Sequence, residues 1–410
     1  MRAYLLFVVL AACGSSAKPS SSPATASSGA TDAPSTSPTA ATAPSSTTGG
    51  GTKDAPATAP AGAKSDSALA ILSTSEADCG LDGTGKPWKW PNGKLEAGPT
   101  SLSGAKAISC SSTHTCVVTG EGTVSCWGDN TYGALGDGTQ KNPDGPVVAK
   151  DVKNAEEVDV DVSRTCARTS GGEVYCWGDR EFAKAGDGTL IDGHKGREKP
   201  LPGKPVLGLA GANSLAVSLV HSCASTGDGS VMCWGQCRSG ACGQPPRPPW
   251  IPRAMKAPKV SGVGSLSAGD VATCGIDKSG GVMCWGTSQY GVLGESVADT
   301  KPHEAPSKIA LPSAAAEVRV GIGGHACARL STGAVYCWGH NDHGQLGDGT
   351  TTDRKSPAPV KGVDKALHIA AGDSTACAVV EGGRLFCWGQ KRVMKKGALE
   401  DAPTPVEITK

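Results

Sequence analysis

Cysteine has the most chemistry available of any residue type in this sequence, because a thiol forms disulfides, binds metals, attacks electrophiles or carries a lipid. The chain of 410 residues contains 17 cysteines, a high count for a reducing cytosol. The odd number requires one cysteine with a separate role. Six pairs share one spacing, with nine residues between the two cysteines and Trp-Gly after the second: Cys116 and Cys126, Cys166 and Cys176, Cys223 and Cys233, Cys274 and Cys284, Cys327 and Cys337, and Cys377 and Cys387.

Each of these repeats has the internal pattern of a β-hairpin. In the first copy, Gly120 and Gly122 lie at the midpoint, where a tight turn needs positive φ, so Cys116 is expected opposite Cys126. Opposed residues in antiparallel strands have Cα atoms about 4.5 to 5.5 Å apart, which a disulfide can close. We therefore predict a disulfide within each hairpin. The alternative is that cysteine is only a small buried apolar residue at both places.

The remaining cysteines extend this pattern. Cys79 begins a seventh, degenerate copy, in which Lys89 replaces the second cysteine and a tryptophan still follows. An extra cysteine at Cys110 is expected to pair with Cys79, and Cys237 is expected to pair with Cys242. Metal binding explains the cysteines less well, because structural zinc sites favour gaps of about two to four residues within a ligand pair, and none of the six copies has one.

The amino terminus accounts for the unpaired cysteine. Met1 and Arg2 precede an apolar run that ends at residue 12 and is too short to span a bilayer, which indicates a signal peptide over residues 1–12. Leu10 to Cys13 resembles the lipobox of bacterial lipoproteins, in which the signal is cut before the cysteine and the thiol is acylated. This resemblance implies lipidation of Cys13. The alternatives are a plain secretory signal with a chance cysteine, or a misassigned start codon.

Residues 13–66 have the composition of a tether. From Gly14 to Asp66 only Gly, Ser, Ala, Thr, Pro, Lys and Asp occur, so the stretch is expected to stay disordered and to hold the folded part away from a membrane. Position 14 is not the Asp that retains some lipoproteins at the inner membrane. By analogy, we expect a bacterial cell-envelope protein, lipid-anchored at the outer membrane and contacting the membrane only through the anchor.

Residues 67–410 consist of seven repeats. The six intact hairpins follow one another at offsets of 50, 57, 51, 53 and 50 residues, and between them recur a Gly-Asp-Gly-Thr turn, a Pro-Val strand and an apolar strand. About four short strands in ~50 residues, repeated radially, predict an all-β fold, a seven-bladed β-propeller. The carboxy-terminal strand around Pro405 to Ile408 is expected to complete the first blade, so that N- and C-terminal strands close the ring in one blade.

Neighbouring residues of a strand point to opposite faces of its sheet. In each Cys-Trp step the disulfide is therefore expected to face one adjacent blade and the tryptophan the other. This arrangement makes the tryptophans core residues rather than a platform for stacking sugars or bases.

Composition excludes two classes of protein. The 57 Gly and 28 Pro argue against a mostly helical fold. The 39 Lys and Arg against 38 Asp and Glu give a net charge of +1, which leaves no basic excess for a dedicated nucleic-acid binder. We expect no nucleic-acid partner.

The repeat carries a family likeness. The segment from His325 to Thr350, HACARLSTGAVYCWGHNDHGQLGDGT, resembles the repeat of the regulator of chromosome condensation family, and the likeness extends over residues 67–410. It implies a seven-bladed propeller. The founding member acts as a guanine-nucleotide exchange factor for a nuclear GTPase and contacts chromatin, but its functional loop matches no segment here, so no functional residues carry over.

No catalytic, cofactor or metal site is predicted. His114, His221 and His325 share one repeat position, which Ala272 fills in another copy, so their role is expected to be structural. His340 and His343 lie on a polar turn, where solvated side chains are the commoner case. No nucleophile elbow, phosphate loop or dinucleotide fingerprint stands in a suitable setting. We therefore expect a protein that is not an enzyme and binds no cofactor.

Two irregular loops are candidates for partner binding. The longest unit adds Lys195 and Arg197, and the next loop carries Arg247 and Trp250 beside the expected cysteine clip. Tryptophan and arginine on a stiffened loop are residue types that anchor interfaces. The alternative for Trp250 is packing against its own blade.

The sequence therefore predicts a monomeric, non-enzymatic scaffold that binds an unidentified protein or wall component at the cell envelope. Two other functions stay open. One is a regulator of a small GTPase resembling an exchange factor, if the signal is spurious. The other is a propeller enzyme, such as a lyase or glycosidase, with its active site in the central channel, which several acidic or basic residues from different blades would favour.

Overall fold

The computed structural model describes residues 69–73, 78–91, 93–189, 203–245, 249–294, 301–395 and 398–409, and only the backbone of 391–395, 398 and 399. The chain divides into two units, 1–60 and 61–410, and all described residues belong to the second. The predicted signal peptide, the lipidated Cys13 and the tether lie outside the described residues.

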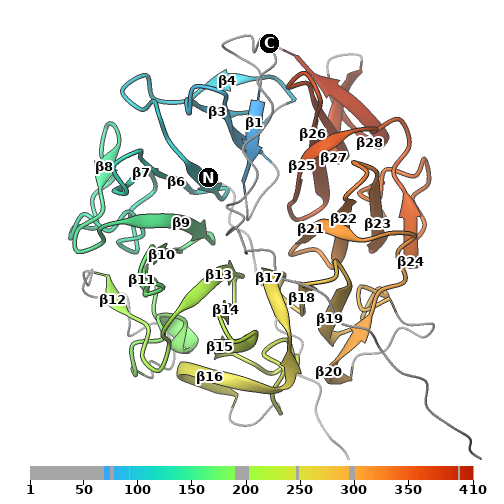
Figure 1. Ribbon diagram of the computed structural model, residues 1–410. Coiled ribbons are helices and arrows are strands. Elements are labelled where there is room, and N and C mark those ends of the chain that lie inside the picture. Colours follow the sequence, from blue (N-terminus) through green and yellow to red (C-terminus); the bar gives the residue numbers. More distant parts are fainter. Residues whose placement is uncertain are drawn as a thin grey trace, which may run out of the picture. The chain divides into compact units, whose positions relative to one another are not determined.

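Seven four-stranded antiparallel sheets form the fold, and they are arranged in a ring (Figure 1). Within each sheet the strands are hydrogen-bonded in sequence order, with the first strand nearest the centre of the ring and the fourth at the rim. The described residues contain one short helical element, η1 (Glu181–Ala183). The predicted all-β, seven-bladed propeller is confirmed.

The first four blades span residues 69 to 261. Blade 1 contains β1 (Leu69–Leu72), β2 (Cys79–Asp82), β3 (Pro87–Lys89) and β4 (Glu96–Ala97); blade 2 contains β5 (Ala107–Cys110), β6 (His114–Val118), β7 (Val124–Gly128) and β8 (Val147–Val148); blade 3 contains β9 (Ala155–Val160), β10 (Arg164–Thr169), β11 (Val174–Gly178) and β12 (Lys204–Pro205); blade 4 contains β13 (Ala212–Val217), β14 (His221–Thr226), β15 (Ser230–Gln236) and β16 (Trp250–Ser261).

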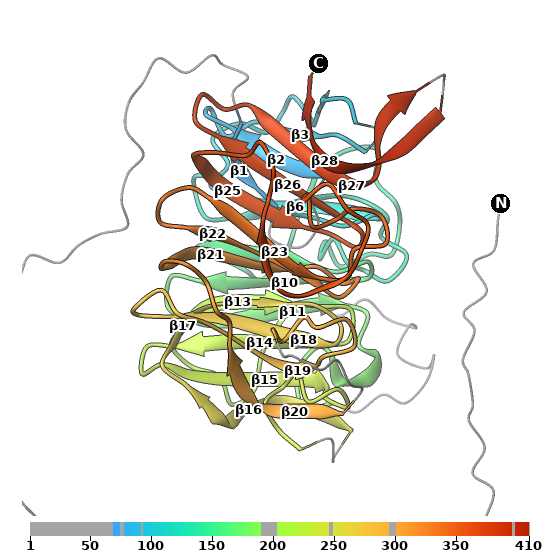
Figure 2. The same cartoon turned by 90° about the vertical axis from the view of Figure 1, so that its right-hand side faces the viewer.

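The other three blades span residues 263 to 408. Blade 5 contains β17 (Val263–Ala268), β18 (Ala272–Asp277), β19 (Val282–Thr287) and β20 (Pro302–Lys308); blade 6 contains β21 (Ala315–Val320), β22 (His325–Leu330), β23 (Val335–Gly339) and β24 (Arg354–Pro359); blade 7 contains β25 (Ala366–Ala371), β26 (Thr375–Val380), β27 (Leu385–Lys395) and β28 (Ala398–Ile408). In Figure 2 the hairpin formed by β27 and β28 extends beyond the rest of its blade.

The second and third strands of each blade form the predicted hairpin. In blade 2, Cys116 is directly opposite Cys126, with their Cα atoms 4.1 Å apart. Only one of the two central glycines has the expected backbone, since φ is +78° at Gly122 but Gly120 is not left-handed. The reason is the turn itself: the amide of Gly122 donates to the carbonyl of Thr119, so only its last residue needs positive φ.

The predicted closure of the ring is wrong. The carboxy-terminal strand β28 pairs with β27 of its own blade, and blade 1 supplies its own outer strand, β4. The physical reason is that in every unit the outer strand follows its own hairpin, so the last one belongs to the last blade. Blades 7 and 1 meet instead through side-by-side packing and two backbone hydrogen bonds, from Leu69 to Gly383 and from Leu95 to Thr409.

The blades pack through core clusters that repeatedly combine a buried cysteine with a buried tryptophan. In each of six core clusters, a buried cysteine of one blade lies with the buried tryptophan of the next blade: Cys116 with Trp177, Cys166 with Trp234, Cys223 with Trp285, Cys274 with Trp338, Cys327 with Trp388, and Cys377 with Trp90. The last contact crosses the seam between blades 7 and 1. This confirms the prediction that the disulfide and the tryptophan face opposite neighbours, and it makes these tryptophans core residues.

Candidate functional site

Eight cysteine pairs lie at disulfide distance in the described part of the chain. Six join the two central strands of blades 2 to 7, at the positions expected from the repeat. Cys237 lies next to Cys242 within the loop of blade 4. Cys79 of blade 1 lies next to Cys110 of blade 2, so this pair joins two neighbouring blades. Sixteen of the 17 cysteines are thus placed in pairs, and Cys13 is the remaining one.

In five of the seven blades, the Gly-rich turn of the preceding blade accepts a hydrogen bond from the repeat tryptophan. The indole Nε1 of Trp177 donates to the carbonyl of Ala134 at 2.8 Å, and Trp285 donates to Ala241 at the same distance. The corresponding donors in blades 4, 6 and 7 are Trp234, Trp338 and Trp388, which reach Lys184, Val292 and Gln345. Blade 7 has the β27–β28 hairpin in place of such a turn, and Nε1 of Trp90 in blade 1 is buried with no partner among the described residues.

The shared histidine position also bridges blades. Nε2 of His114 lies 2.8 Å from Oγ1 of Thr165 in the next blade, and Nε2 of His221 lies 2.9 Å from Oγ1 of Thr273. Burial lowers the pKa of His114 to about 4 and that of His221 to about 3. These neutral, buried rings connect adjacent blades, which agrees with the expected structural role.

The first strands, which line the centre of the ring, are connected by side chains rather than by a shared sheet. The hydroxyl of Ser109 in blade 2 accepts a hydrogen bond from the amide of Val160 in blade 3 at 3.1 Å. Asp159 of blade 3 accepts from the amide of Val217 in blade 4 at 2.8 Å, and Glu317 of blade 6 accepts from Ile369 in blade 7 at 3.2 Å. These contacts satisfy amides at the inner edge of each sheet, where no further strand is present.

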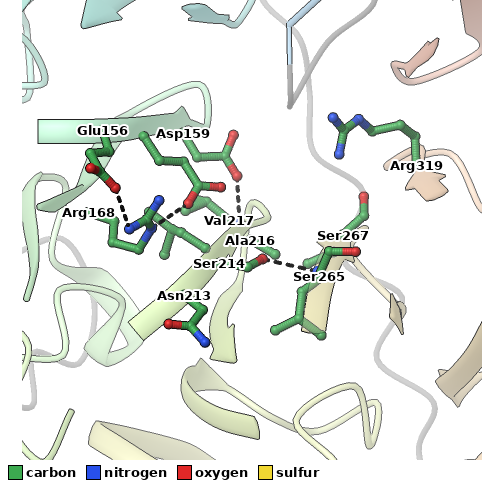
Figure 3. Close-up of a pocket in the computed structure, with 14 residues that line it drawn as sticks. Glu156, Asp159, Arg168, Asn213, Ser214, Ala216, Val217, Ser265, Ser267 and Arg319 are labelled. Carbon is green, nitrogen blue, oxygen red and sulfur yellow. Dashed lines mark hydrogen bonds and ion pairs between the residues drawn. The ribbon is translucent and has the colours of Figure 1, made fainter. Parts of the chain in front are cut away.

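A cavity of about 320 Å³ lies on this inner side of the ring (Figure 3). Strands β9, β13 and β17 supply most of its wall, and Arg319 of β21 approaches from the opposite side. On the blade 3 wall, Arg168 Nε lies 2.8 Å from Glu157 and its Nη1 lies 3.2 Å from Glu156. Burial raises the pKa of Glu157, since removal from water disfavours its charged form.

Arg319 belongs to a second group of charges, on blade 6. Its Nη2 lies 2.8 Å from Oε1 of Glu317, and Arg329 Nε lies 3.3 Å from Oε2 of the same carboxylate. The Nε of Arg319 is buried and has no acceptor among the described residues. The guanidinium therefore has hydrogen-bonding capacity left over at the edge of the cavity.

Sequence reasoning missed these channel residues. A signal for two of them exists: the inner-strand position opposite the first cysteine of the hairpin is small in four blades, with Ser109, Ala216, Ser267 and Ala370. Asp159 and Arg319 replace the small residue at this position in blades 3 and 6. A comparison of the repeats by strand register, rather than by cysteine spacing, identifies them.

A second carboxylate with a raised pKa lies in the loop between the first and second strands of blade 5. Asp270 accepts a hydrogen bond from the amide of Leu219 in blade 4 at 3.2 Å. Burial, with Asp161 and Asp373 adding repulsion, raises the pKa of Asp270 to about 7. Its charge consequently changes in the neutral pH range.

The loop histidines are engaged in ordinary contacts. His340 stacks on Tyr290 with ring centroids 4.0 Å apart, and His343 Nδ1 lies 2.7 Å from Asp401. Among the residues that the structure describes, no three or more His, Cys, Asp and Glu side chains are grouped to hold a metal ion. Within the same part of the chain, no helix has the length and apolar character needed to cross a bilayer.

Of the four candidate partner-binding residues, only Trp250 lies among the described ones. Lys195, Arg197 and Arg247 lie outside them. Trp250 begins β16, is half-buried, and packs with Phe182 of the blade 3 loop at 6.2 Å between ring centroids. Arg238 lies over its ring at 5.7 Å. The side chain therefore contacts its own propeller.

Two stretches of the chain match family models described as regulator of chromosome condensation (RCC1) repeats, residues 332–379 and 105–134. The chain is 30% identical over 212 residues to the RCC1 domain-containing protein RUG3, mitochondrial, of Arabidopsis thaliana, which covers 48% of this chain and 46% of that protein. It is 31% identical over 305 residues to the E3 ubiquitin-protein ligase HERC2 of Homo sapiens, covering 73% of this chain and 5% of that protein. The chain thus spans about half, or much less, of these relatives.

Solved structures share the fold. Prp20p of Saccharomyces cerevisiae, described with its binding to Gsp1p and histones, superposes with a TM-score of 0.64 at 21% identity over 82% of this chain and 87% of that one. Human WBSCR16 superposes with a TM-score of 0.65 at 19% identity over 77% and 84%.

Proposed function

Because this chain is a seven-bladed β-propeller of RCC1 repeats, we propose that it is a non-enzymatic binding scaffold, held at the outer membrane of a bacterial cell envelope by a lipid on Cys13. On this proposal a face of the ring binds a protein or a wall component. The tether from 13 to 66 gives the ring its distance from the membrane.

The observation that carries the proposal is the placement of the cysteines. Sixteen lie in pairs at disulfide distance, two of these pairs outside the regular hairpins, and the one remaining is the cysteine of the lipobox. Disulfides persist in oxidising compartments outside the cytosol, so the pairs support export. Acyl chains contribute about 0.8 kcal/mol per buried CH₂, so more than one chain on Cys13 supports stable anchoring.

Two further observations support binding over catalysis. The carboxylates of the cavity wall are already paired, Glu156 and Glu157 with Arg168, and Asp159 with a backbone amide. Prp20p, with the same fold, binds other proteins. The channel carries charges from different blades, the feature that favours a propeller enzyme, but these charges contact one another.

Metabolic labelling with an alkyne fatty acid tests the anchor. The native protein is expected to take up label and to fractionate with the outer membrane, whereas Cys13→Ser is expected to lose the label and become soluble. Cys116→Ser is the matched control, because it also removes one cysteine but leaves the lipobox intact. An unlabelled native protein, or equal labelling of Cys13→Ser, would contradict the proposed anchoring.

Crosslinking in intact cells tests binding. The full-length, tethered protein is expected to give a defined crosslinked product that unlabelled propeller competes away in a saturable manner. A set of products that added propeller does not reduce would contradict the scaffold function.

A further inference from the structure

The inner cavity combines opposite charges on facing walls, and this arrangement indicates a ligand with two charged ends. Its volume of about 320 Å³ is at the small end of the range for ligand pockets, which excludes a large occupant. Its wall is polar, with Asn213 and Ser265 contributing an amide and a hydroxyl between the charged residues. A small polar molecule fits this lining better than an apolar one.

Arg319 is the group with donor capacity left for a ligand. Glu317 contacts only its Nη2, and its buried Nε has no acceptor among the described residues. A buried N–H without an acceptor costs on the order of 1–3 kcal/mol. A carboxylate matches the planar fork of a guanidinium; because Nε is closed to solvent, a ligand in the cavity reaches the Nη atoms of Arg319.

The facing wall suits a positive group. Glu156 is half-exposed, and it contacts Arg168 through a single nitrogen at 3.2 Å. Figure 3 shows Glu156 and Arg168 across the cavity from Arg319, with Asn213 and Ser214 between the two sides. A ligand whose carboxylate contacts Arg319 therefore has its other end directed toward the carboxylates of the opposite wall.

We propose that this cavity binds a small peptide-like zwitterion, of the size of an amino acid or a dipeptide, with its free carboxylate on Arg319 and its amino end toward Glu156. A phosphate is a poorer fit, because the cavity offers it one incompletely paired arginine beside three carboxylates. The site does not depend on Cys13, so it is testable separately from the envelope anchor.

Titration calorimetry of the purified, disulfide-intact protein with glycylglycine tests the site. We expect saturable binding with a Kd of about 1 mM or tighter. Glycylglycine amide, which lacks the carboxylate, is expected to bind at least about tenfold more weakly, a difference of about 1.4 kcal/mol. Equal binding of the acid and the amide, or no saturable binding of the acid, would overturn the proposal.

Two arginine variants locate the site. Arg319→Gln is expected to weaken binding of glycylglycine about tenfold. Arg329→Gln is the matched control, because Arg329 contacts the same Glu317 but does not line the cavity, and it is expected to leave the Kd within about twofold. Equal effects of the two substitutions would place the ligand elsewhere.

Arg319→Lys tests whether a loss of binding in Arg319→Gln could come from a folding defect. It keeps the positive charge and removes the planar fork, so a weaker but still saturable binding of the acid is expected. Near-ultraviolet circular dichroism of the buried tryptophans reports whether each variant is folded. The native protein is expected to bind glycylglycine more tightly than glycylglycine amide. If folded Arg319→Lys loses this preference for the acid, Arg319 recognises the carboxylate. If folded Arg319→Lys keeps the full preference, Arg319 does not have that role.

Discussion

Nε1 of Trp338 in blade 6 donates a 2.7 Å hydrogen bond to the carbonyl oxygen of Val292 in the loop of blade 5. The same bond recurs from blade 3 to blade 7, where a Gly-rich turn presents the acceptor. It is missing at Trp90, which follows the one blade with a β-hairpin in place of the turn. Five of the seven blade contacts thus share this bond; the seam between the chain ends lacks it, and between blades 1 and 2 the corresponding Trp127 is only partly buried.

Replacing Trp338 and Trp90 with phenylalanine is expected to distinguish the blade contact that includes the hydrogen bond from the one that lacks it. Trp338→Phe removes the donor and leaves the carbonyl of Val292 buried and unpaired, whereas Trp90→Phe removes a donor that has no partner in the part of the chain that the structure describes. Both lose similar ring volume, so Trp338→Phe is expected to lower the free energy of unfolding by about 1–3 kcal/mol more than Trp90→Phe. Urea unfolding measures both, and equal losses would show that the hydrogen bond contributes nothing.

A threonine at position 376 is expected to stabilise the contact between blades 6 and 7. His325 is fully buried, and among the described residues neither ring nitrogen has a side-chain hydrogen-bond partner, because Ala376 occupies the position that Thr165 and Thr273 fill opposite the other histidines. Ala376→Thr supplies a hydroxyl to Nε2 of His325, and a gain of about 1 kcal/mol in unfolding free energy is expected.

Ala326→Thr is the control for Ala376→Thr. It occupies the same strand position one blade earlier, where the preceding blade carries Ala272 instead of a histidine. This variant adds the same atoms without a new histidine partner, so no comparable gain is expected. A gain of equal size in both variants would mean that the hydroxyl acts through another contact.

Alanine substitution of the turn glycine next to Trp177 is expected to destabilise the protein far more than alanine substitution of a glycine with a similar backbone conformation elsewhere. Gly136 and Gly104 have φ of +73° and +68°, so alanine strains both, by about 1–2 kcal/mol. A Cβ on Gly136 lies 2.7 Å from Nε1 of Trp177, whereas one on Gly104 meets nothing within 4 Å. Gly136→Ala is expected to cost at least about 1–3 kcal/mol more than Gly104→Ala in thermal or urea unfolding, as overpacking does.

The buried histidines predict a loss of stability in acid. Burial, with Arg164 adding repulsion, lowers the pKa of His221 to about 3, so the unfolded chain binds a proton below about pH 6.5 while the native ring stays neutral. Unfolding free energy is therefore expected to fall from pH 6.5 toward pH 3, by about 1.4 kcal/mol per pH unit for this residue. His221→Gln is expected to reduce the measured slope by that amount.

Asp270 is expected to make the unfolding free energy depend on pH in the opposite direction to His221. Its pKa is raised to about 7, so the native state holds a proton that the unfolded chain has released, and its contribution to stability is lost as pH rises from about 4 through 7. Asp270→Asn keeps an oxygen that accepts from the amide of Leu219. Relative to the native protein, the unfolding free energy of this variant is expected to be higher at pH 8 than at pH 5. A pH-independent effect of either substitution would contradict the shifted pKa behind it.

Mass mapping of unreduced protein is expected to show eight disulfides with the pairing described, including Cys79 with Cys110 between blades 1 and 2. Alkylation after denaturation without a reductant is expected to label none of these sixteen cysteines. Labelling at the hairpin pairs would remove the argument for an oxidising compartment and would favour a cytosolic exchange-factor-like role.

The sequence by itself determined the number of blades, the facing of Cys116 and Cys126, and the burial of most repeat tryptophans, because these follow from one hairpin whose spacing recurs. The tertiary structure decided the rest, since contacts between blades depend on which copies become neighbours in the ring. Only it shows that β28 stays in blade 7, that Trp90 Nε1 and the His325 ring have no side-chain partner among the described residues, and that Arg319 faces the wall of Glu156. The surroundings of Trp90 and His325 and the position of Arg319 depend on packing between residues far apart in the chain, which spacing within one repeat does not encode, whereas β28 pairs with β27, its neighbour in the chain.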